Sequence, residues 1–323
     1  MSIIGIDIGG TKCLAVRADD DGTVQTVRRC TTGGAEDTVA RLLDAVAGLE
    51  PGPDPVFGVS CGGPLDVAAG LICSPPNLPG WDRVPILDLL TSRFGGRGFL
   101  MNDADAGALA EWRCGAGVGT RDLVFLTFGT GIGAGLICGG RLHEGATGNS
   151  GEIGHVRLSD DGPLGHGKHG SVEGWCSGGG LARRVADLVA AGGLPRAWPH
   201  RDAQALAQAA RSGEADAARL LQDTGRMLGR TIAILIDILN PEVVVLGSIF
   251  VRARNLLEGP LRDELAREAL PGSLAACRIV PSALGERLGE HQAVAVAIHR
   301  TLQAADGEAG PRPVPPSPRR RRR

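Results

Sequence analysis

The sequence predicts an α/β fold, because strand-like and helix-like segments alternate along most of the chain. One such set spans residues 1–117 and a second spans residues 118–287. Each set contains an apolar run that enters a glycine-rich turn and leaves it as another apolar run, as a β-hairpin does. Two similar hairpins so far apart in the sequence indicate a duplicated architecture of two domains.

The first hairpin opens the chain. An apolar run over residues 3–8 is followed by the turn residues Gly9, Gly10, Thr11 and Lys12. Glycines let backbone N–H groups approach an anion closely, and the threonine and lysine add a hydroxyl and a positive charge. Asp7, at the end of the predicted strand, is placed to hold a magnesium ion through water. These residue types predict a phosphate-handling turn.

The second hairpin repeats this pattern. Residues 123–128 predict a buried strand, residues 136–138 predict its return, and the turn between them contains Thr130, Gly131 and Gly133. The turn also fits the G-x-G-x-x-A fingerprint of dinucleotide enzymes, and an acidic residue, Glu152, follows about twenty positions later. That fingerprint opens a helix, whereas a strand is predicted here. An NAD-dependent dehydrogenase is therefore a distant alternative.

The other elements follow in order. We expect helices over residues 38–48, 105–113, 180–191, 203–212, 214–239 and 288–304. Further strands are expected over residues 56–60, 98–101 and 242–248. The Asn240-Pro241 pair ends the longest helix. We expect the last helix to pack back onto the first domain, and residues 305–323, rich in proline and arginine, to form a disordered tail.

Composition excludes several classes of protein. Of 323 residues, 43% are hydrophobic and 22% charged, as in an ordinary soluble protein. The net charge is −2, but six arginines lie in the tail, so the body of the chain is acidic and ill suited to nucleic acid. We expect no membrane span and no signal peptide. The eight cysteines form no C-x-x-C pair, which suggests reduced thiols in the cytoplasm.

Several polar residues have spacing that suits chemistry on a hydroxyl. Asn102 and Asp103 follow a short strand and precede a helix, where they serve either as helix caps or, for Asp103, as a general base. Asn77 lies in a rigid loop over residues 75–81. Glu152, His155 and Glu173 form a further polar group in a Gly-rich region, which suits a ligand rich in hydroxyls. Each also has a plain structural explanation when it is considered alone.

Five of these segments together resemble the ROK family (repressors, open reading frames and kinases). They are D-I-G-G-T-K at residues 7–12, N-L-P-G-W at 77–81, N-D-A-D at 102–105, G-T-G-I-G at 129–133 and G-E-I-G-H at 151–155. The resemblance spans roughly residues 3–300. It implies a two-domain actin/hexokinase-like (ribonuclease H-like) fold with a cleft between the domains. It also implies phosphorylation of a sugar by ATP and Mg²⁺, bacterial glucokinase acting on the glucose 6-hydroxyl being the nearest type.

The resemblance also implies roles for individual residues. Asp103 matches the family's catalytic base. Residues expected to contact the sugar are Gly63, Asn77, Asn102, Asp103, Glu152, His155 and Glu173. Residues expected near ATP are Asp7, Gly9, Gly10, Thr11, Lys12, Thr130, Gly131, Gly133, Gly247 and Ser248, the last standing where the family more often has glycine.

The chain departs from the family at a metal site. Many members hold structural zinc with three cysteines and the histidine of G-E-I-G-H. Here Leu164, His166 and Ser171 replace the cysteines, so a thiolate site cannot form. His155, His166 and His169 remain as a weaker alternative set of ligands. We predict that structural zinc is absent, and that the loop bearing Glu173 depends on packing.

Several alternatives remain open at this point. The acceptor is glucose by default, and an amino sugar, an N-acetylhexosamine or a sugar-like cyclitol would use similar contacts. The phosphoryl donor is ATP or polyphosphate. A transcriptional repressor of the family is disfavoured, because no room for a helix-turn-helix precedes the strand that starts at Ile3. The resemblance leads us to expect a homodimer or homotetramer, with no nucleic-acid or membrane partner.

Overall fold

The computed structural model describes residues 2–305, which form two compact units. Unit 1 comprises residues 2–106, 144–150 and 289–305, and unit 2 comprises residues 107–143 and 151–288. The first change of unit falls inside helix α3 (Asp103–Cys114) rather than in a loop. The tail predicted to be disordered lies, beyond its first residue, outside the described residues.

Unit 1 is built on a five-stranded sheet of order β3-β2-β1-β4-β7. Strands β1 (Ser2–Ile8), β2 (Lys12–Ala18) and β3 (Val24–Thr31) form an antiparallel meander. Strands β4 (Pro55–Cys61) and β7 (Arg97–Asn102) pair parallel to β1. All seven residues of β4 are buried, as a strand covered on both faces requires.

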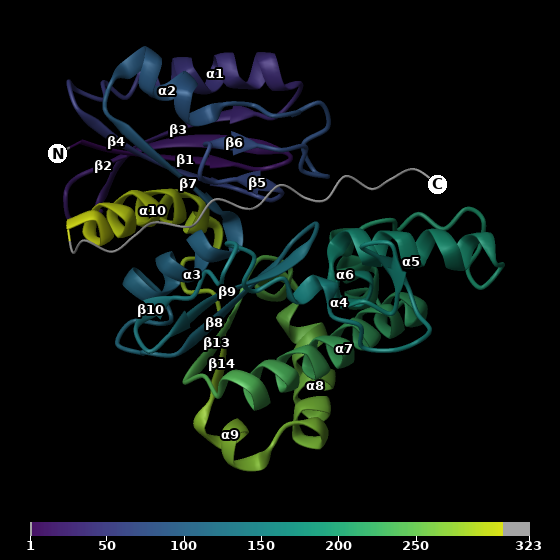
Figure 1. Ribbon diagram of the computed structural model, residues 1–323. Helices are drawn as coiled ribbons and strands as arrows, with labels where there is room; N and C mark the ends of the chain where they lie inside the picture. The colour runs from purple at the N-terminus through teal and green to yellow at the C-terminus, as the bar shows by residue number, and fades with distance from the viewer. Residues whose placement is uncertain (1, 306–323) are drawn as a thin grey trace, which may run out of the picture. The chain divides into compact units, whose positions relative to one another are not determined.

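Helices cover both faces of this sheet. The apolar faces of α1 (Ala35–Ala47) and α2 (Ile86–Phe94) pack on one face, and α10 (Leu288–Ala305) packs on the other (Figure 1). Gly5 and Gly58, which are register partners, let the α10 backbone lie directly on the sheet. A Cβ at Gly5 would lie 2.9 Å from the amide nitrogen of Val294, so a larger residue there would displace the helix.

Unit 2 repeats the plan of unit 1, with the strand order β10-β9-β8-β13-β14. Strands β8 (Leu123–Phe128), β9 (Ile132–Cys138) and β10 (Arg141–Leu142) are antiparallel. Strands β13 (Val243–Leu246) and β14 (Arg278–Pro281) pair parallel to β8 and to β13 respectively. The duplication predicted from the two hairpins is therefore confirmed in strand order and direction.

The core of unit 2 includes a close pair of helices, α7 (Ala215–Leu239) and α8 (Ile249–Glu268). A Cβ at Gly225 or Gly229 of α7 would lie within 2.7 Å of a backbone carbonyl of α8, so these glycines allow the helices to touch. The sequence predicted α7 and its end, where Asn240 adopts φ 46°. It missed α8, whose interior contains Pro260, normally a helix breaker.

The remaining elements are short or peripheral. In unit 1 they are β5 (Leu65–Asp66) and β6 (Leu71–Ile72). In unit 2 they are η1 (Ile153–His155), β11 (Leu164–Gly165), β12 (Lys168–His169), α4 (Val172–Cys176), α5 (Gly178–Ala190), α6 (Ala203–Arg211), α9 (Pro271–Ala276) and η2 (Gly285–Arg287). Over residues 2–305, no helix has the length and apolar character needed to cross a membrane.

Candidate active site

The polar residues of unit 1 gather where its three parallel strands end. Backbone pairing sets Ile8, Cys61 and Asn102 in one row across β1, β4 and β7. The residues that follow each strand therefore meet at the carboxyl edge of the sheet, where ligands bind in open α/β sheets. Asp103 follows Asn102 directly, so the register itself delivers it to this edge.

The Gly62-Gly63 turn after β4 lies among the predicted sugar-binding side chains. A Cβ at Gly62 would lie 3.7 Å from Oδ2 of Asp103 and 3.8 Å from both amide atoms of Asn77. A Cβ at Gly63 would lie 3.5 Å from Nδ2 of Asn102. Three side chains thus surround a stretch of backbone that has no side chain of its own, which leaves room for a hydroxyl-bearing ligand.

Asn102 also performs the structural role that the sequence left open. Its Oδ1 accepts a hydrogen bond of 2.9 Å from the backbone N–H of Ala104, so it caps the start of α3. Its amide nitrogen, on the other side of the group, lies near Gly63. Capping therefore fixes the side chain in the orientation that presents its N–H groups to the turn.

Asp7 is held by two residues that sequence reasoning did not identify. The amide Nε2 of Gln292, on α10, donates to Oδ1 of Asp7 at 2.5 Å and to Oγ of Ser60 at 2.9 Å. Burial raises the pKa of Asp7 to about 7; the Gln292 hydrogen bond opposes this rise and the charge of Asp103 adds to it. A partly buried carboxylate beside a second carboxylate fits a divalent cation held through water.

The first hairpin turn exposes its predicted phosphate-handling residues. Gly10, Thr11 and Lys12 are all exposed, while Oγ1 of Thr32 donates to the carbonyl of Gly9 at 2.6 Å and anchors the turn. A Cβ at Gly10 would lie 2.7 Å from the carbonyl oxygen of Asn77. The turn and the Asn77 loop are therefore in contact, which places a candidate phosphate site beside a candidate sugar contact.

In unit 2 the second hairpin turn receives the N-terminus of α5. The N–H groups of Gly178 and Gly179 donate to the carbonyls of Gly129 and Thr130 at 2.8 and 2.9 Å. Ser177 caps this helix by accepting from the N–H of Gly180. The Ser-Gly-Gly-Gly run carries a capping signal, but the sequence prediction started this helix at residue 180 and missed its contact with the turn.

Gly247 and Ser248 follow β13 at the same edge as the second hairpin. The N–H of Gly247 donates to the carbonyl of Leu126 in β8 at 3.0 Å. Ser248 has φ 39° and ψ −99°, a backbone conformation that favours glycine. A glycine at this position would adopt the same conformation without that strain.

The segment 151–155 is tied to β9 by its glycines. Gly151 has φ 78°, and a Cβ at this position would overlap the carbonyl oxygen of Ala134. The N–H of Ala134 donates to the carbonyl of Gly151 at 2.8 Å. This anchor presents Glu152 and His155, which are about half exposed and 3.8 Å apart between Oε2 and Nε2. Both predicted sugar contacts therefore face solvent at the edge of β9.

Two histidines connect this segment to Glu173. The rings of His155 and His166 stack with centroids 3.6 Å apart, and Nε2 of His166 lies 3.0 Å from Oε2 of Glu173. Burial lowers the pKa of His155, and its electrostatic interaction with the neighbouring His166 lowers it further. A Cβ at Gly131 would lie 3.2 Å from Oε2 of Glu173, so this carboxylate lies against the hairpin turn.

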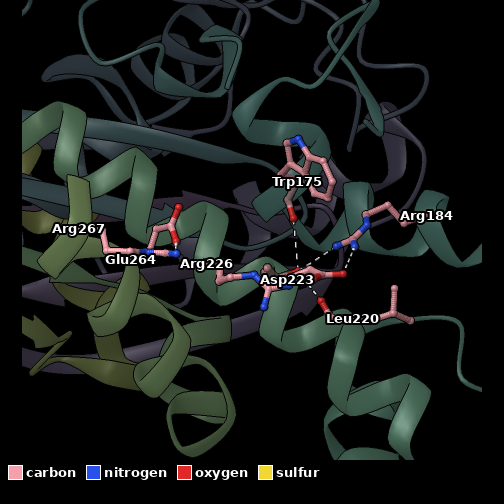
Figure 2. Close-up of polar contacts among 8 residues, drawn as sticks. Trp175, Arg184, Leu220, Asp223, Arg226, Glu264 and Arg267 are labelled. Atoms are coloured by element: carbon pink, nitrogen blue, oxygen red, sulfur yellow. Dashed lines mark hydrogen bonds and ion pairs between the residues drawn. The ribbon is translucent and has the colours of Figure 1, made fainter. Parts of the chain in front are cut away.

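Helix α4, which carries Glu173, is attached to α7 by polar contacts (Figure 2). Oγ1 of Thr224 lies 3.4 Å from the carbonyl oxygen of Trp175 and 3.1 Å from that of Leu220, and its one proton is shared between these two acceptors. The guanidinium of Arg184 lies 4.8 Å from the centroid of the Trp175 indole ring and pairs with Asp223 at 3.1 Å. These contacts fix the end of α4 that lies away from His166.

The residues at the family's zinc positions do not fit a zinc site. Leu164 has no donor atom, and Oγ of Ser171 already donates to the carbonyl of Gly165 and accepts from the N–H of Gly174. Nδ1 of His169 lies 2.8 Å from the carbonyl of Gly162. Within residues 2–305, no group of three or more His, Cys, Asp or Glu side chains is arranged to hold a metal ion.

Comparison with known proteins gives consistent matches. The ROK family pattern matches residues 3–300. The chain is 33% identical to the glucokinase of Thermotoga maritima, over 90% of this chain and 95% of that protein. It is 34% identical to the N-acetylmannosamine kinase of Citrobacter koseri, over 83% and 90% of the two chains.

A solved structure agrees with these matches. The ROK family glucokinase of Streptomyces griseus, in complex with glucose and AMPPNP, superposes with a TM-score of 0.74 at 28% identity and covers 93% of this chain and 100% of that one. The predicted α/β fold of actin/hexokinase type is confirmed. The family match over nearly the whole described chain, together with the fold, shows that this protein is a member of the ROK family.

Proposed function

We propose that the protein is an ATP-dependent kinase that transfers the γ-phosphoryl group to a hydroxyl of a hexose, with glucose as the best-supported acceptor. The observation that carries the proposal is the gathering of Asp103, Asn77 and the Gly62-Gly63 turn at one sheet edge. A glycine hairpin suited to phosphate lies in contact with that edge. The glucokinase of Thermotoga maritima, at 33% identity, supports the same activity.

In this proposal Asp103 is the general base. Its carboxylate accepts a hydrogen bond from the attacking hydroxyl and takes the proton as the new O–P bond forms. Asn77 and Asn102 hold neighbouring hydroxyls in unit 1. The sugar-binding residues proposed in unit 2 are Glu152, His155 and Glu173.

The two hairpins handle the phosphates. Their N–H groups donate to phosphate oxygens, and Lys12 adds a positive charge. The residues proposed for this role are Gly9, Gly10, Thr11, Lys12, Thr130, Gly131, Gly133, Gly247 and Ser248. Mg²⁺, held near Asp7 through water, would neutralise charge on the β- and γ-phosphates.

An N-acetylhexosamine is the second candidate acceptor. The observation that favours it is the 34% identity to the N-acetylmannosamine kinase of Citrobacter koseri, which is similar to the 33% identity to the glucokinase of Thermotoga maritima. Glu152 and His155, two of the proposed sugar contacts, are about half exposed. Polyphosphate is retained as an alternative donor.

We further propose a cytoplasmic dimer or tetramer. All eight cysteines are free thiols, which suits a reducing compartment. Sedimentation or light scattering of the purified full chain measures the assembly; a monomer at micromolar concentration would contradict this part of the proposal.

The deciding experiment is a coupled ADP-release assay. The panel contains glucose, mannose, glucosamine, N-acetylmannosamine and a cyclitol, each with ATP and with polyphosphate as donor. We expect the highest kcat/KM for glucose with ATP. Highest activity on N-acetylmannosamine would select the second candidate, and no activity on any acceptor would refute the proposed function.

A further inference from the structure

We propose that His166 is a positioning residue for Glu173, and that its imidazole Nε2–H orients the carboxylate in a loop that needs no metal. The inference rests on the proposed role of Glu173 in holding a sugar hydroxyl. The loop contains Leu164, His166 and Ser171 and no cysteine, and the described residues form no group arranged to hold a metal ion, so the direction of Glu173 depends on contacts within the protein.

The backbone determines where His166 points. His166 and Gly167 form a two-residue turn between β11 and β12, with φ values of 49° and 72°. Two consecutive positive φ values are typical of the tightest hairpin turns, whose geometry leaves little freedom. The turn therefore sets the direction of the Cα–Cβ bond of His166, and in the observed side-chain conformation Nε2 lies 3.0 Å from Oε2 of Glu173.

Glu173 is fixed from its own helix as well. Ser171 caps α4 by accepting from the N–H of Gly174 at 3.1 Å, and it donates to the carbonyl of Gly165 in β11 at 3.2 Å. One buried hydroxyl thus joins the helix that carries Glu173 to the strand that precedes His166. Serine performs a structural role here at a position where the family resemblance implies a zinc-binding cysteine.

The far end of α4 is held by contacts of Trp175, which Figure 2 draws together with Arg184. The carbonyl oxygen of Trp175 lies 3.4 Å from Oγ1 of Thr224, its ring lies against the guanidinium of Arg184, and its Nε1 donates to Oγ of Ser159 at 3.0 Å. With both ends of α4 attached, the carboxylate retains mainly side-chain rotation. The His166 contact removes that remaining freedom.

The carboxylate also has close neighbours on its other sides. Glu173 is only 18% exposed; Nη2 of Arg183 lies 3.9 Å from Oε1, and Gly131 of the hairpin turn lies beneath Oε2. His155 stacks on His166 and restrains the plane of the imidazole ring. His166 therefore links two proposed sugar contacts, His155 and Glu173, and holds both beside the phosphate turn.

The test compares His166→Ala with His166→Gln, whose amide can still donate to the carboxylate. We expect His166→Ala to raise the KM for the sugar about 10-fold, with kcat and the KM for ATP within about twofold of wild type. His166→Gln should recover most of the loss. His200→Ala is the matched control, because His200 forms a similar pair with Glu214 at 2.8 Å in the same unit and should leave the sugar KM unchanged.

Two further measurements keep the inference separate from the proposed function. Long-range ¹H–¹⁵N spectra of the wild-type imidazoles should show the proton of His166 on Nε2; a proton on Nδ1 alone would overturn the inference, whether or not any sugar is phosphorylated. Elemental analysis should find no stoichiometric zinc. An unchanged sugar KM in a folded His166→Ala variant, or a bound zinc whose removal abolishes activity, would also overturn it.

Discussion

The carboxyl edges of the two sheets share a strand plan but hold their polar residues in different ways. In unit 1, register places Asp103 and the neighbouring turns directly after parallel strands, and buried partners such as Gln292 fix Asp7. In unit 2, the polar residues stand on the turn-rich segment 151–173 and are fixed by side-chain contacts and caps. The proposed base is thus positioned by backbone register, whereas the proposed sugar contacts of unit 2 are positioned mainly by side-chain contacts and caps.

The largest expected effect tests the edge of unit 1. Asp103→Asn removes the proposed base and keeps the shape of the side chain, so we expect kcat to fall about 10³-fold. Sugar affinity, measured by calorimetry, should stay within about threefold, because an amide still bonds to a hydroxyl. A variant that retains a tenth or more of wild-type turnover would remove Asp103 from the role of base.

The second prediction concerns the burial of Asp7. The unfolded-state pKa is near 3.8 and the folded-state pKa is about 7, so the folded state holds this proton more tightly. Wild-type stability should therefore fall as pH rises from about 4 to 7 through this group, by an amount of the order of 4 kcal/mol.

Asp7→Asn should not show this loss. Urea unfolding of both proteins at pH 5 and pH 8, without ligands, measures the difference, and the variant should gain relative stability at pH 8. Asp88→Asn, at an exposed carboxyl on α2, is the control and should behave as wild type does at both pH values. If Asp7→Asn changed the free energy of unfolding equally at pH 5 and pH 8, the ionised Asp7 carboxylate would not destabilise the folded state.

The third prediction tests the anchor of the polar segment in unit 2. Gly151→Ala places a Cβ against the carbonyl of Ala134 at φ 78°, so we expect a loss of about 3 kcal/mol in the free energy of unfolding. Gly192 has the same φ with open space around its Cβ position. Gly192→Ala should cost about 1 kcal/mol, and equal losses in the two variants would show that the contact with β9 contributes little.

The smallest expected effect concerns Ser248. Ser248→Gly relieves an unfavourable φ of 39° and should raise stability by about 1 kcal/mol, measured as the urea midpoint at constant m-value. Asn240→Gly, at φ 46°, should gain less, because asparagine tolerates the left-handed region. Destabilisation by Ser248→Gly would indicate that the serine hydroxyl makes a favourable contact.

Much of the fold could be predicted because local patterns carried it. The hairpins at residues 3–16 and 123–138 and the long helix that ends at Asn240 follow from apolar runs, glycine turns and a helix stop. Strand β3 was not predicted, because most of its residues are exposed and its pattern is weakly apolar. Helix α8 was not predicted because Pro260 lies within it. In the folded protein, the packing of α7 against the α8 backbone outweighs the helix-breaking penalty of this proline.

The candidate site divides along similar lines. The sequence by itself determined where the turns fall and which glycine and polar residues stand at them. A glycine turn after an apolar strand and an Asn-Asp pair before a helix are local signals. Only the tertiary structure decided that Gln292 meets Asp7, 285 positions away, and that His166 meets Glu173. Such contacts depend on how helices and hairpins dock, and docking is set by the summed packing of many residues rather than by any one stretch of sequence.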